Sequence, residues 1–92
     1  MSKYVYLNNK YVNYKDAKIH IEDRGFQFSD SVYEVIKVIN GKLLDIEFHL
    51  GRLKYSTSEL NFNYKINKTS LKNIFVSLVK KNQLKNGIIY LQ

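Results

Sequence analysis

The stretch from residue 31 to residue 39 constrains the fold of this chain most strongly. Successive side chains of a strand point to opposite faces. One face here carries Val32, Ile36 and Val38, and the other carries Tyr33, Val35, Lys37 and Ile39. Because both faces are apolar, the stretch predicts a central strand with a neighbour on each side. Asn40 and Gly41 then predict a two-residue hairpin turn, and the residues after it should pair back onto the strand.

Further short β-rich runs surround this strand. Tyr4–Leu7 and Lys10–Tyr14 flank two asparagines, which tolerate the left-handed geometry that a hairpin turn needs. Lys18–Ile21 also alternates between polar and apolar residues. A turn at Asn86 and Gly87 introduces a last β-run, which has no closing turn and looks cut. We therefore expect mainly antiparallel strands.

The apolar spacing changes to that of helices after residue 44. A first helix is predicted from about 45 to 60, with Asp45 as its N-cap. Its stripe is Ile46, Leu50, Leu53, Thr57 and Leu60. A second helix should end near Asn82, and its stripe is Leu71, Ile74, Phe75, Leu78 and Val79. The fold class expected for residues 1–92 is a single α+β domain with a mainly antiparallel sheet and two helices.

The composition narrows the functional classes. The absence of cysteine excludes a disulfide framework and a thiolate metal site. The first residues lack the apolar core of a signal peptide, and no apolar run reaches membrane-spanning length, so we expect a cytoplasmic protein. The net charge of +7 comes from thirteen lysines and two arginines against eight acids. These lysines are scattered, which favours a solvated surface over nucleic-acid binding, the remaining alternative.

The loop before the central strand is a first candidate site. It concentrates Arg24, Gly25, Phe26, Phe28 and Asp30 just ahead of Tyr33. Gly25 permits unusual backbone geometry, Asp30 is placed to bond loop amides, and the Tyr33 phenol could reach into a cleft. The alternative is that the aromatic residues bury themselves at the end of the sheet.

Arg52 is a second candidate. It lies three residues after His49 and shares a helix face with it. A guanidinium binds phosphate or carboxylate through two parallel hydrogen bonds, which lysine cannot reproduce. Arg52 therefore indicates an oxyanion site, unless it pairs on the surface with an acid such as Glu59 or Glu47. Gly51 in mid-helix costs about 1 kcal/mol of helix stability relative to alanine. Either a neighbouring group approaches the helix closely at this position, or the glycine arose by sequence drift.

The residue spacing supports neither a metal site nor a hydroxyl nucleophile. His20 and His49 lie on different elements without metal-ligand spacing, so no metal is expected. The hydroxyl residues 56–58 have no evident partner base, and we interpret them as the end of a helix.

These motifs together resemble one family. The residues from Glu22 to Leu53 read EDRGFQFSDSVYEVIKVINGKLLDIEFHLGRL, and the chain closes with GIIYLQ. This pattern resembles the N-terminal small domain of class IV pyridoxal-phosphate-dependent aminotransferases, and it is most similar to the D-amino-acid (D-alanine) aminotransferase branch. The resemblance covers essentially the whole chain.

The resemblance implies a set of roles. Arg52 would hold the phosphate of pyridoxal 5′-phosphate, and Tyr33 would face the cofactor and substrate. Val35 and Lys37 would line the substrate pocket beside Tyr33. The lysine that forms the Schiff base in this family lies in the C-terminal catalytic domain, which this chain lacks, so no catalytic residue is assigned here.

Three functional hypotheses follow. The first is a truncated or split D-amino-acid aminotransferase that is inactive alone. The second is a subunit that complements a separately encoded C-terminal half, with a homodimer as a further possible assembly. The third is a basic nucleic-acid-binding domain, which would leave the Tyr33 and Arg52 pattern unexplained.

Overall fold

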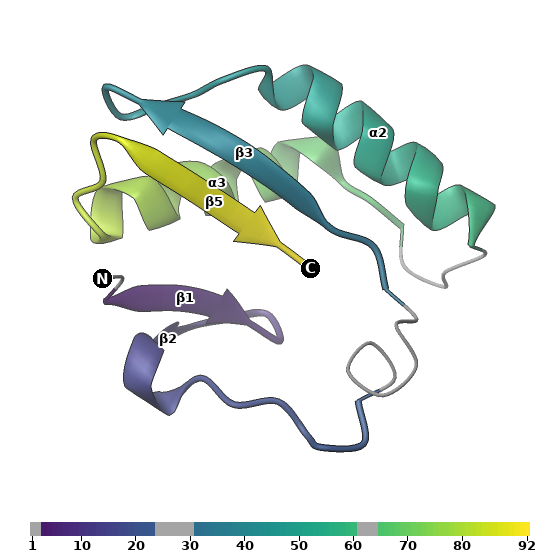
Figure 1. Ribbon diagram of the computed structural model, residues 1–92, viewed down its shortest axis with the longest axis horizontal. Helices are drawn as coiled ribbons and strands as arrows, with labels where there is room; N and C mark the ends of the chain where they lie inside the picture. The colour runs from purple at the N-terminus through teal and green to yellow at the C-terminus, as the bar shows by residue number, and fades with distance from the viewer. Residues whose placement is uncertain (1–2, 24–30, 61–64) are drawn as a thin grey trace.

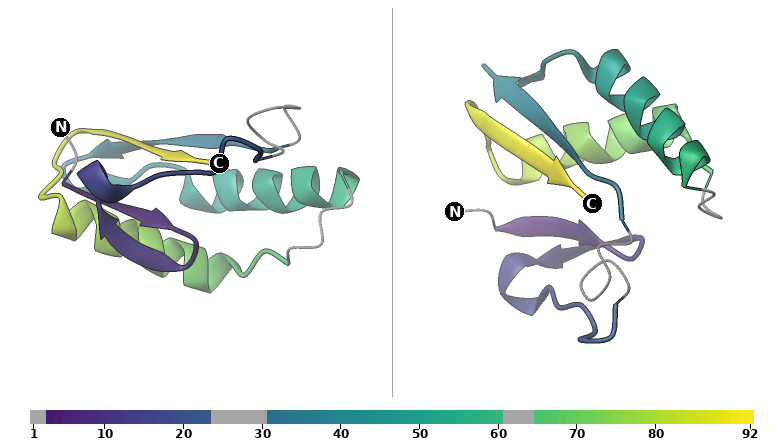
Figure 2. Two further views of the ribbon diagram at one scale, coloured as in Figure 1. Left: turned by 90° about the horizontal axis from the view of Figure 1, so that it is seen from below. Right: turned by 45° about the vertical axis from the view of Figure 1, so that its right-hand side comes forward.

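The computed structural model describes residues 3–23, 31–60 and 65–92. Five strands, two α-helices and a short 3₁₀ helix, η1 (Tyr14–Asp16), form an α+β unit in this part of the chain (Figure 1). β1 (Tyr4–Leu7) and β2 (Lys10–Asn13) make an antiparallel hairpin. A second sheet has the order β4-β3-β5 and is antiparallel throughout. Two helices, α2 (Ile46–Glu59) and α3 (Lys68–Lys81), cover one face of this sheet (Figure 2).

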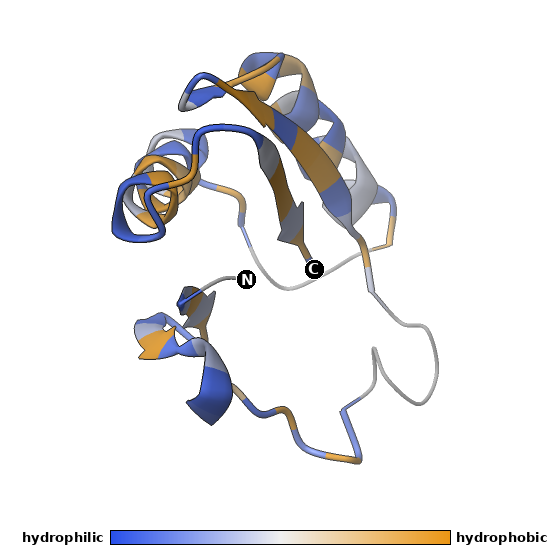
Figure 3. Cartoon of the chain, turned by 60° about the vertical axis from the view of Figure 1, so that its left-hand side comes forward, coloured by the Kyte–Doolittle hydropathy of each residue, from blue (hydrophilic) through white to orange (hydrophobic). Residues whose placement is uncertain are grey.

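The predicted central strand is confirmed. β3 (Glu34–Ile39) lies between β4 (Lys42–Leu43) and β5 (Gly87–Leu91). Its side chains alternate strictly between buried and exposed positions. Figure 3 shows this strand as mainly hydrophobic with polar breaks, so its two faces are not separated by hydropathy. Asn40 and Gly41 both adopt positive φ, at 51° and 74°, as the two-residue turn demands.

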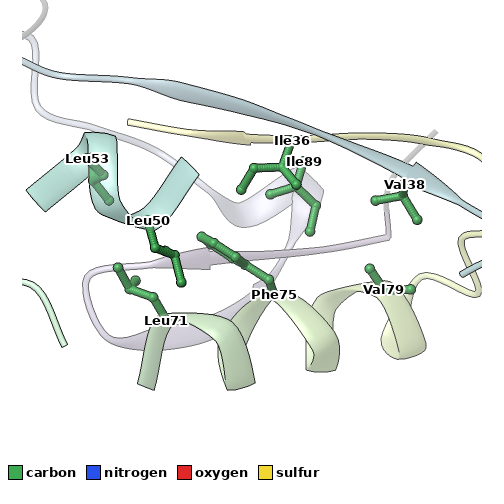
Figure 4. Close-up of a cluster of buried hydrophobic side chains, with 8 residues drawn as sticks. All are labelled: Ile36, Val38, Leu50, Leu53, Leu71, Phe75, Val79 and Ile89. Carbon is green, nitrogen blue, oxygen red and sulfur yellow. The ribbon is translucent and has the colours of Figure 1, made fainter. Parts of the chain in front are cut away.

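One hydrophobic core joins the sheet to the helices. Its buried members are Ile36, Val38, Leu50, Leu53, Leu71, Phe75, Val79 and Ile89. Figure 4 shows the Phe75 ring reaching from α3 into the space between α2 and the sheet. The periodicity predicted most of these residues, although Leu60 at the end of the α2 stripe is exposed. At the beginning of α3, the side chain of Asn67 provides an N-cap by accepting a hydrogen bond from the Ser70 N–H at 3.0 Å.

Of three local predictions, two were wrong and one was correct only in part. Lys18–Ile21 forms no strand, because His20 closes a turn by accepting hydrogen bonds from the N–H groups of Glu22 and Asp23. Asp45 is the N-cap residue of α2, as predicted, but it adopts a left-handed φ of 54° and its side chain makes no cap bond, so its carbonyl alone serves the helix by accepting from the His49 N–H.

The third concerns the turn before β5. The left-handed residue is Gln83, at φ 49°, whereas Gly87 already belongs to the strand. The N–H groups of Gln83 and Leu84 bond back to the carbonyls of Lys80 and Val79, which ends α3 with a Schellman motif. A Cβ at Gly87 would lie 2.9 Å from a methyl group of Leu84, so a larger residue there would require the Leu84 side chain to shift.

Candidate functional site

A buried carboxylate at the beginning of β3 organises the candidate site. Glu34 shares the inward face of the strand with Ile36 and Val38, and only 4% of its side chain is exposed. A carboxylate in such a position requires partners, because desolvation of an unpaired charge is costly. The sequence interpretation missed Glu34. The signal was present, since alternation alone places residue 34 on the buried face.

The partners of Glu34 come from one face of α2. Arg52 donates from Nε to Oε2 and from Nη2 to Oε1, both at 2.8 Å, which is the parallel two-bond geometry of a guanidinium and a carboxylate. His49 lies 2.7 Å from Oε1 through its Nδ1, and this nitrogen donates when Glu34 is ionised. The predicted common face of His49 and Arg52 is therefore confirmed. The alternative in which Arg52 pairs with an acid is confirmed in kind, but its partner is the buried Glu34 and not Glu59 or Glu47.

These contacts change the proton affinity of both charged groups. The hydrogen bond from Arg52 lowers the pKa of Glu34, with His49 acting in the same direction, although burial opposes them. The same bond to Glu34 raises the pKa of Arg52. Glu34 is therefore an anion and Arg52 a cation near neutral pH.

A surface depression of about 370 Å³ opens beside this pair. Its lining consists of Tyr33, Glu34, Val35, Arg52 and Ser56. The Arg52 side chain is 52% exposed, and three of its five N–H groups are not engaged by Glu34. The structure thus brings together the predicted residues Arg52, Tyr33 and Val35.

Lys37 does not join them. It is exposed on the same strand face as Tyr33 and Val35, but it is not among the residues that line the depression. Tyr33 is 65% exposed and stacks on Tyr90 of β5, with ring centroids 6.1 Å apart. The alternative in which Tyr33 is buried at the sheet end is wrong for this residue. The other members of that loop, residues 24–30, lie outside the described part of the chain.

The remaining candidates carry no chemistry in this structure. Nothing lies within 4 Å of a Cβ placed on Gly51, so no close approach requires that glycine. The Thr57 hydroxyl donates to the Lys54 carbonyl within α2, at 3.0 Å. In residues 3–23, 31–60 and 65–92, no three His, Cys, Asp or Glu side chains gather as a metal site would require. No helix in these ranges has both the length and the apolar character to cross a membrane.

Comparison with known proteins identifies the family. Residues 31–92 match the family model for amino-transferase class IV. The chain belongs to the class IV aminotransferase family. Among curated relatives of this family member, the D-alanine aminotransferase of Listeria monocytogenes is 39% identical over 88 residues, and that of Bacillus licheniformis is 38% identical over 88 residues. Each match covers 96% of this chain.

The solved structures show the same fold. The crystal structure of the branched-chain amino acid aminotransferase of Escherichia coli superposes with a TM-score of 0.91 over 98% of this chain, at 22% identity. This family member corresponds to 31% of that protein and to 30% of the Listeria D-alanine aminotransferase. The chain therefore spans about a third of the length of the proteins it matches.

Proposed function

We propose that this chain is the phosphate-anchoring N-terminal domain of a D-amino-acid aminotransferase-like protein, and that it does not transaminate alone. In the intact protein, an amino group would pass between a D-amino acid and a 2-oxo acid with pyridoxal 5′-phosphate as cofactor. The observation that carries this proposal is the Arg52 guanidinium, which Glu34 holds on one side and which faces a depression on the other.

The residues present fit the phosphate end of such a cofactor. Glu34 fixes the plane of the Arg52 guanidinium, so the unengaged N–H groups present a preorganised edge to an oxyanion. The paired charges of Glu34 and Arg52 offset one another, and His49 adds a third hydrogen bond to the carboxylate, at Oε1. Arg52 would therefore bind the phosphate, and Glu34 and His49 would position Arg52.

The other roles follow from the outward face of β3. Tyr33 lines the depression beside Arg52 and would face the ring of the cofactor, while Val35 and Lys37 would form one wall for the substrate. The cofactor supplies an electron-withdrawing ring during amino transfer. The reactive lysine and the acid that faces the ring nitrogen would come from the remaining two thirds of the protein.

The anchoring role can be tested with pyridoxamine 5′-phosphate, which lacks an aldehyde that would react with the thirteen lysines. We expect the Nε–H resonance of Arg52 to shift in a saturable way on titration, and pyridoxamine without phosphate to leave it unchanged. Arg52→Lys should weaken binding at least about tenfold, because lysine cannot present the two-bond fork. Lys54→Ala, an exposed change on the same helix, should bind as the unaltered chain does.

Equal affinities of the Arg52→Lys variant and the unaltered chain would overturn the anchoring role.

The proposal that this chain does not transaminate alone has its own test. The purified chain, incubated with pyridoxal 5′-phosphate, D-alanine and 2-oxoglutarate, should produce no pyruvate. Turnover by the chain alone would refute the proposal that the reactive lysine is supplied from elsewhere.

A further inference from the structure

An aromatic residue to which the sequence analysis gave no role lies against the candidate site. Phe48 belongs to the first turn of α2, one turn before Arg52, and it is 63% exposed. Single exposed apolar residues are common on protein surfaces, so the exposure of Phe48 alone indicates nothing. The contacts of its ring are what connect it to the site.

The first contact is with the guanidinium of Arg52. Cζ of Arg52 lies over the Phe48 ring, 5.1 Å from the ring centroid. A cation within about 6 Å of a ring centroid is attracted by the negative face of the ring. Residues four apart on a helix are neighbours on its surface, so the local geometry of α2 is sufficient to bring these two side chains together.

The second contact is with His49. The ring centroids of Phe48 and His49 lie 5.9 Å apart with an interplanar angle of 71°, an edge-to-face arrangement that aromatic pairs favour. His49 and Arg52 are the two side chains that bond to the Glu34 carboxylate. Phe48 therefore touches both partners of Glu34 without touching the carboxylate through a hydrogen bond of its own.

Glu34 and Phe48 restrain Arg52 from different elements. Glu34, on β3, accepts hydrogen bonds from Nε and Nη2 along one edge of the guanidinium. Phe48, on α2, contacts the central carbon of the same group. Two restraints from two elements limit the rotation of a planar group more than either restraint does alone. The edge that Glu34 leaves unengaged is thereby held beside the depression.

A second restraint matters because Arg52 is half exposed. Its side chain is 52% exposed, whereas that of Glu34 is 4% exposed. Ion pairs with a water-accessible partner hold that partner weakly, since fixing a long side chain costs conformational entropy. When a ligand must order such a side chain, the same cost reduces the affinity. A ring that orders Arg52 before binding removes part of this cost.

We propose that Phe48 is a positioning residue of the oxyanion site, whose ring keeps the Arg52 guanidinium in the orientation that binds the cofactor phosphate. This inference rests on the proposed function, because the oxyanion is the one assigned there. Phe48 acts through Arg52 and makes no bond to the ligand. Its contribution is the population of the binding-competent orientation, since the apparent dissociation constant rises in proportion as that population falls.

Tyr55 provides a matched comparison within the same helix. It is also aromatic, and it is 66% exposed. In residues 3–23, 31–60 and 65–92, Tyr55 makes no ring contact and no cation–π contact. Replacing Tyr55 therefore removes an exposed ring from α2 without altering the restraint on Arg52.

The first test uses the ligand-free 92-residue chain labelled with ¹⁵N. The Nε–H of Arg52 is bonded to Glu34, so it exchanges with water when Arg52 leaves the carboxylate. Phe48→Leu keeps an apolar side chain and a strong helix former but removes the ring. We expect the Nε–H of Arg52 to exchange about two- to fivefold faster in Phe48→Leu, which is the range for an exposed cation–π contact. Its resonance should also shift, because the ring current is lost.

The second test measures affinity for pyridoxamine 5′-phosphate by titration of the same resonance. Phe48→Leu should raise the dissociation constant about two- to fivefold. Inorganic phosphate should show the same ratio between the two chains, because the effect belongs to the phosphate end of the ligand. Phe48→Tyr keeps a ring and should restore both the exchange rate and the affinity, and Tyr55→Leu should change neither. Circular dichroism should show the same helix content in all of these variants.

Three results would each overturn the proposal: unchanged Nε–H exchange in Phe48→Leu, unchanged affinity of that variant, or failure of Phe48→Tyr to restore both. An equal effect of Tyr55→Leu would also overturn it, since the loss would then follow from any exposed ring on α2.

Failure of this inference is distinguishable from failure of the phosphate anchor. Weakened binding by Arg52→Lys combined with normal binding by Phe48→Leu would retain the anchor and reject the role of Phe48. Normal binding by Arg52→Lys would reject the anchor and, with it, any positioning of the phosphate by Phe48. Faster Nε–H exchange in Phe48→Leu would then show a restraint on Arg52 that serves the fold alone.

Discussion

Replacing Glu34 by glutamine changes the centre of the candidate site while nearly conserving its shape. The carboxylate accepts three hydrogen bonds, two from Arg52 and one from His49. An amide has one oxygen and one NH₂ group, so either orientation sets the NH₂ against an Arg52 N–H. At least one charge-assisted bond is lost, and the remaining ones become weaker.

The size of the stability loss expected for Glu34→Gln follows from the burial of Glu34 and Arg52. A hydrogen bond to a charged group contributes about 1.5–3 kcal/mol, and rupture of a fully buried ion pair costs about 3–5 kcal/mol. Glu34 is buried, but Arg52 is half exposed and can turn into water. We therefore expect Glu34→Gln to lower the free energy of unfolding by about 2 kcal/mol. For a domain of this size, the melting temperature should fall by ~8–16 °C.

The pH dependence provides an internal check. The pKa of Glu34 is lowered in the folded chain, chiefly by the Arg52 hydrogen bond, from an ordinary value of 4.5. Its contribution to stability is therefore fully present above that ordinary value and is lost as the pH falls through the lower folded value. The difference between the unaltered chain and Glu34→Gln should be constant from about pH 6 to 8 and should shrink below about pH 4.

Urea unfolding followed by circular dichroism measures both effects, and Glu47→Gln is the matched control. Glu47 also lies on α2, but its side chain is 71% exposed and its Oε1 forms just a long ion pair with Lys72 Nζ, at 3.7 Å. Its replacement should therefore change the free energy of unfolding by less than about 0.5 kcal/mol. Equal stabilities of Glu34→Gln and Glu47→Gln would refute the argued role of the buried carboxylate. A difference that persists undiminished at pH 3 would refute its electrostatic origin.

Three further substitutions test the fold, two by the same unfolding measurement and one by amide exchange. Gly51→Ala should stabilise the chain by about 1 kcal/mol, because the glycine has free space around it, and a loss of stability would contradict the absence of a close contact. Asn67→Ala should cost about 1 kcal/mol by removing the cap bond to Ser70, and an unchanged stability would show that the cap contributes nothing. Asn82→Ala should speed amide exchange in β1, starting at Tyr4, by at least about tenfold; unchanged exchange would mean that the hairpin is held by other contacts.

Periodicity predicted the elements whose pattern is repeated over several residues. The alternation in β3 and the stripes of α2 and α3 were correct because burial of one face determines them. The errors occurred where a few backbone bonds decide the conformation. Lys18–Ile21 alternates as a strand does, but the hydrogen bonds that His20 accepts form a turn, and no strand partner exists for it among the described residues.

The site was predicted only in part, because its central contact depends on tertiary packing. Arg52 and Tyr33 could be named individually, because residue type and family resemblance singled them out. Glu34 could not be assigned to Arg52 without knowledge of which face of α2 packs beside β3. That choice depends on how Leu50 and Leu53 dock against the sheet, which is a tertiary property.

The buried carboxylate is better explained by orientation than by stability. An ion pair at a protein surface contributes little, and a buried one can often be replaced by apolar residues without loss. Glu34 nevertheless occupies a core-facing position of the central strand, where an aliphatic side chain would extend the apolar row of Ile36 and Val38. The gain from the carboxylate is geometric, because two of the Arg52 N–H groups are held inward and the others are left facing the depression. A rigid guanidinium edge beside the beginning of the central strand is the arrangement that an oxyanion site requires.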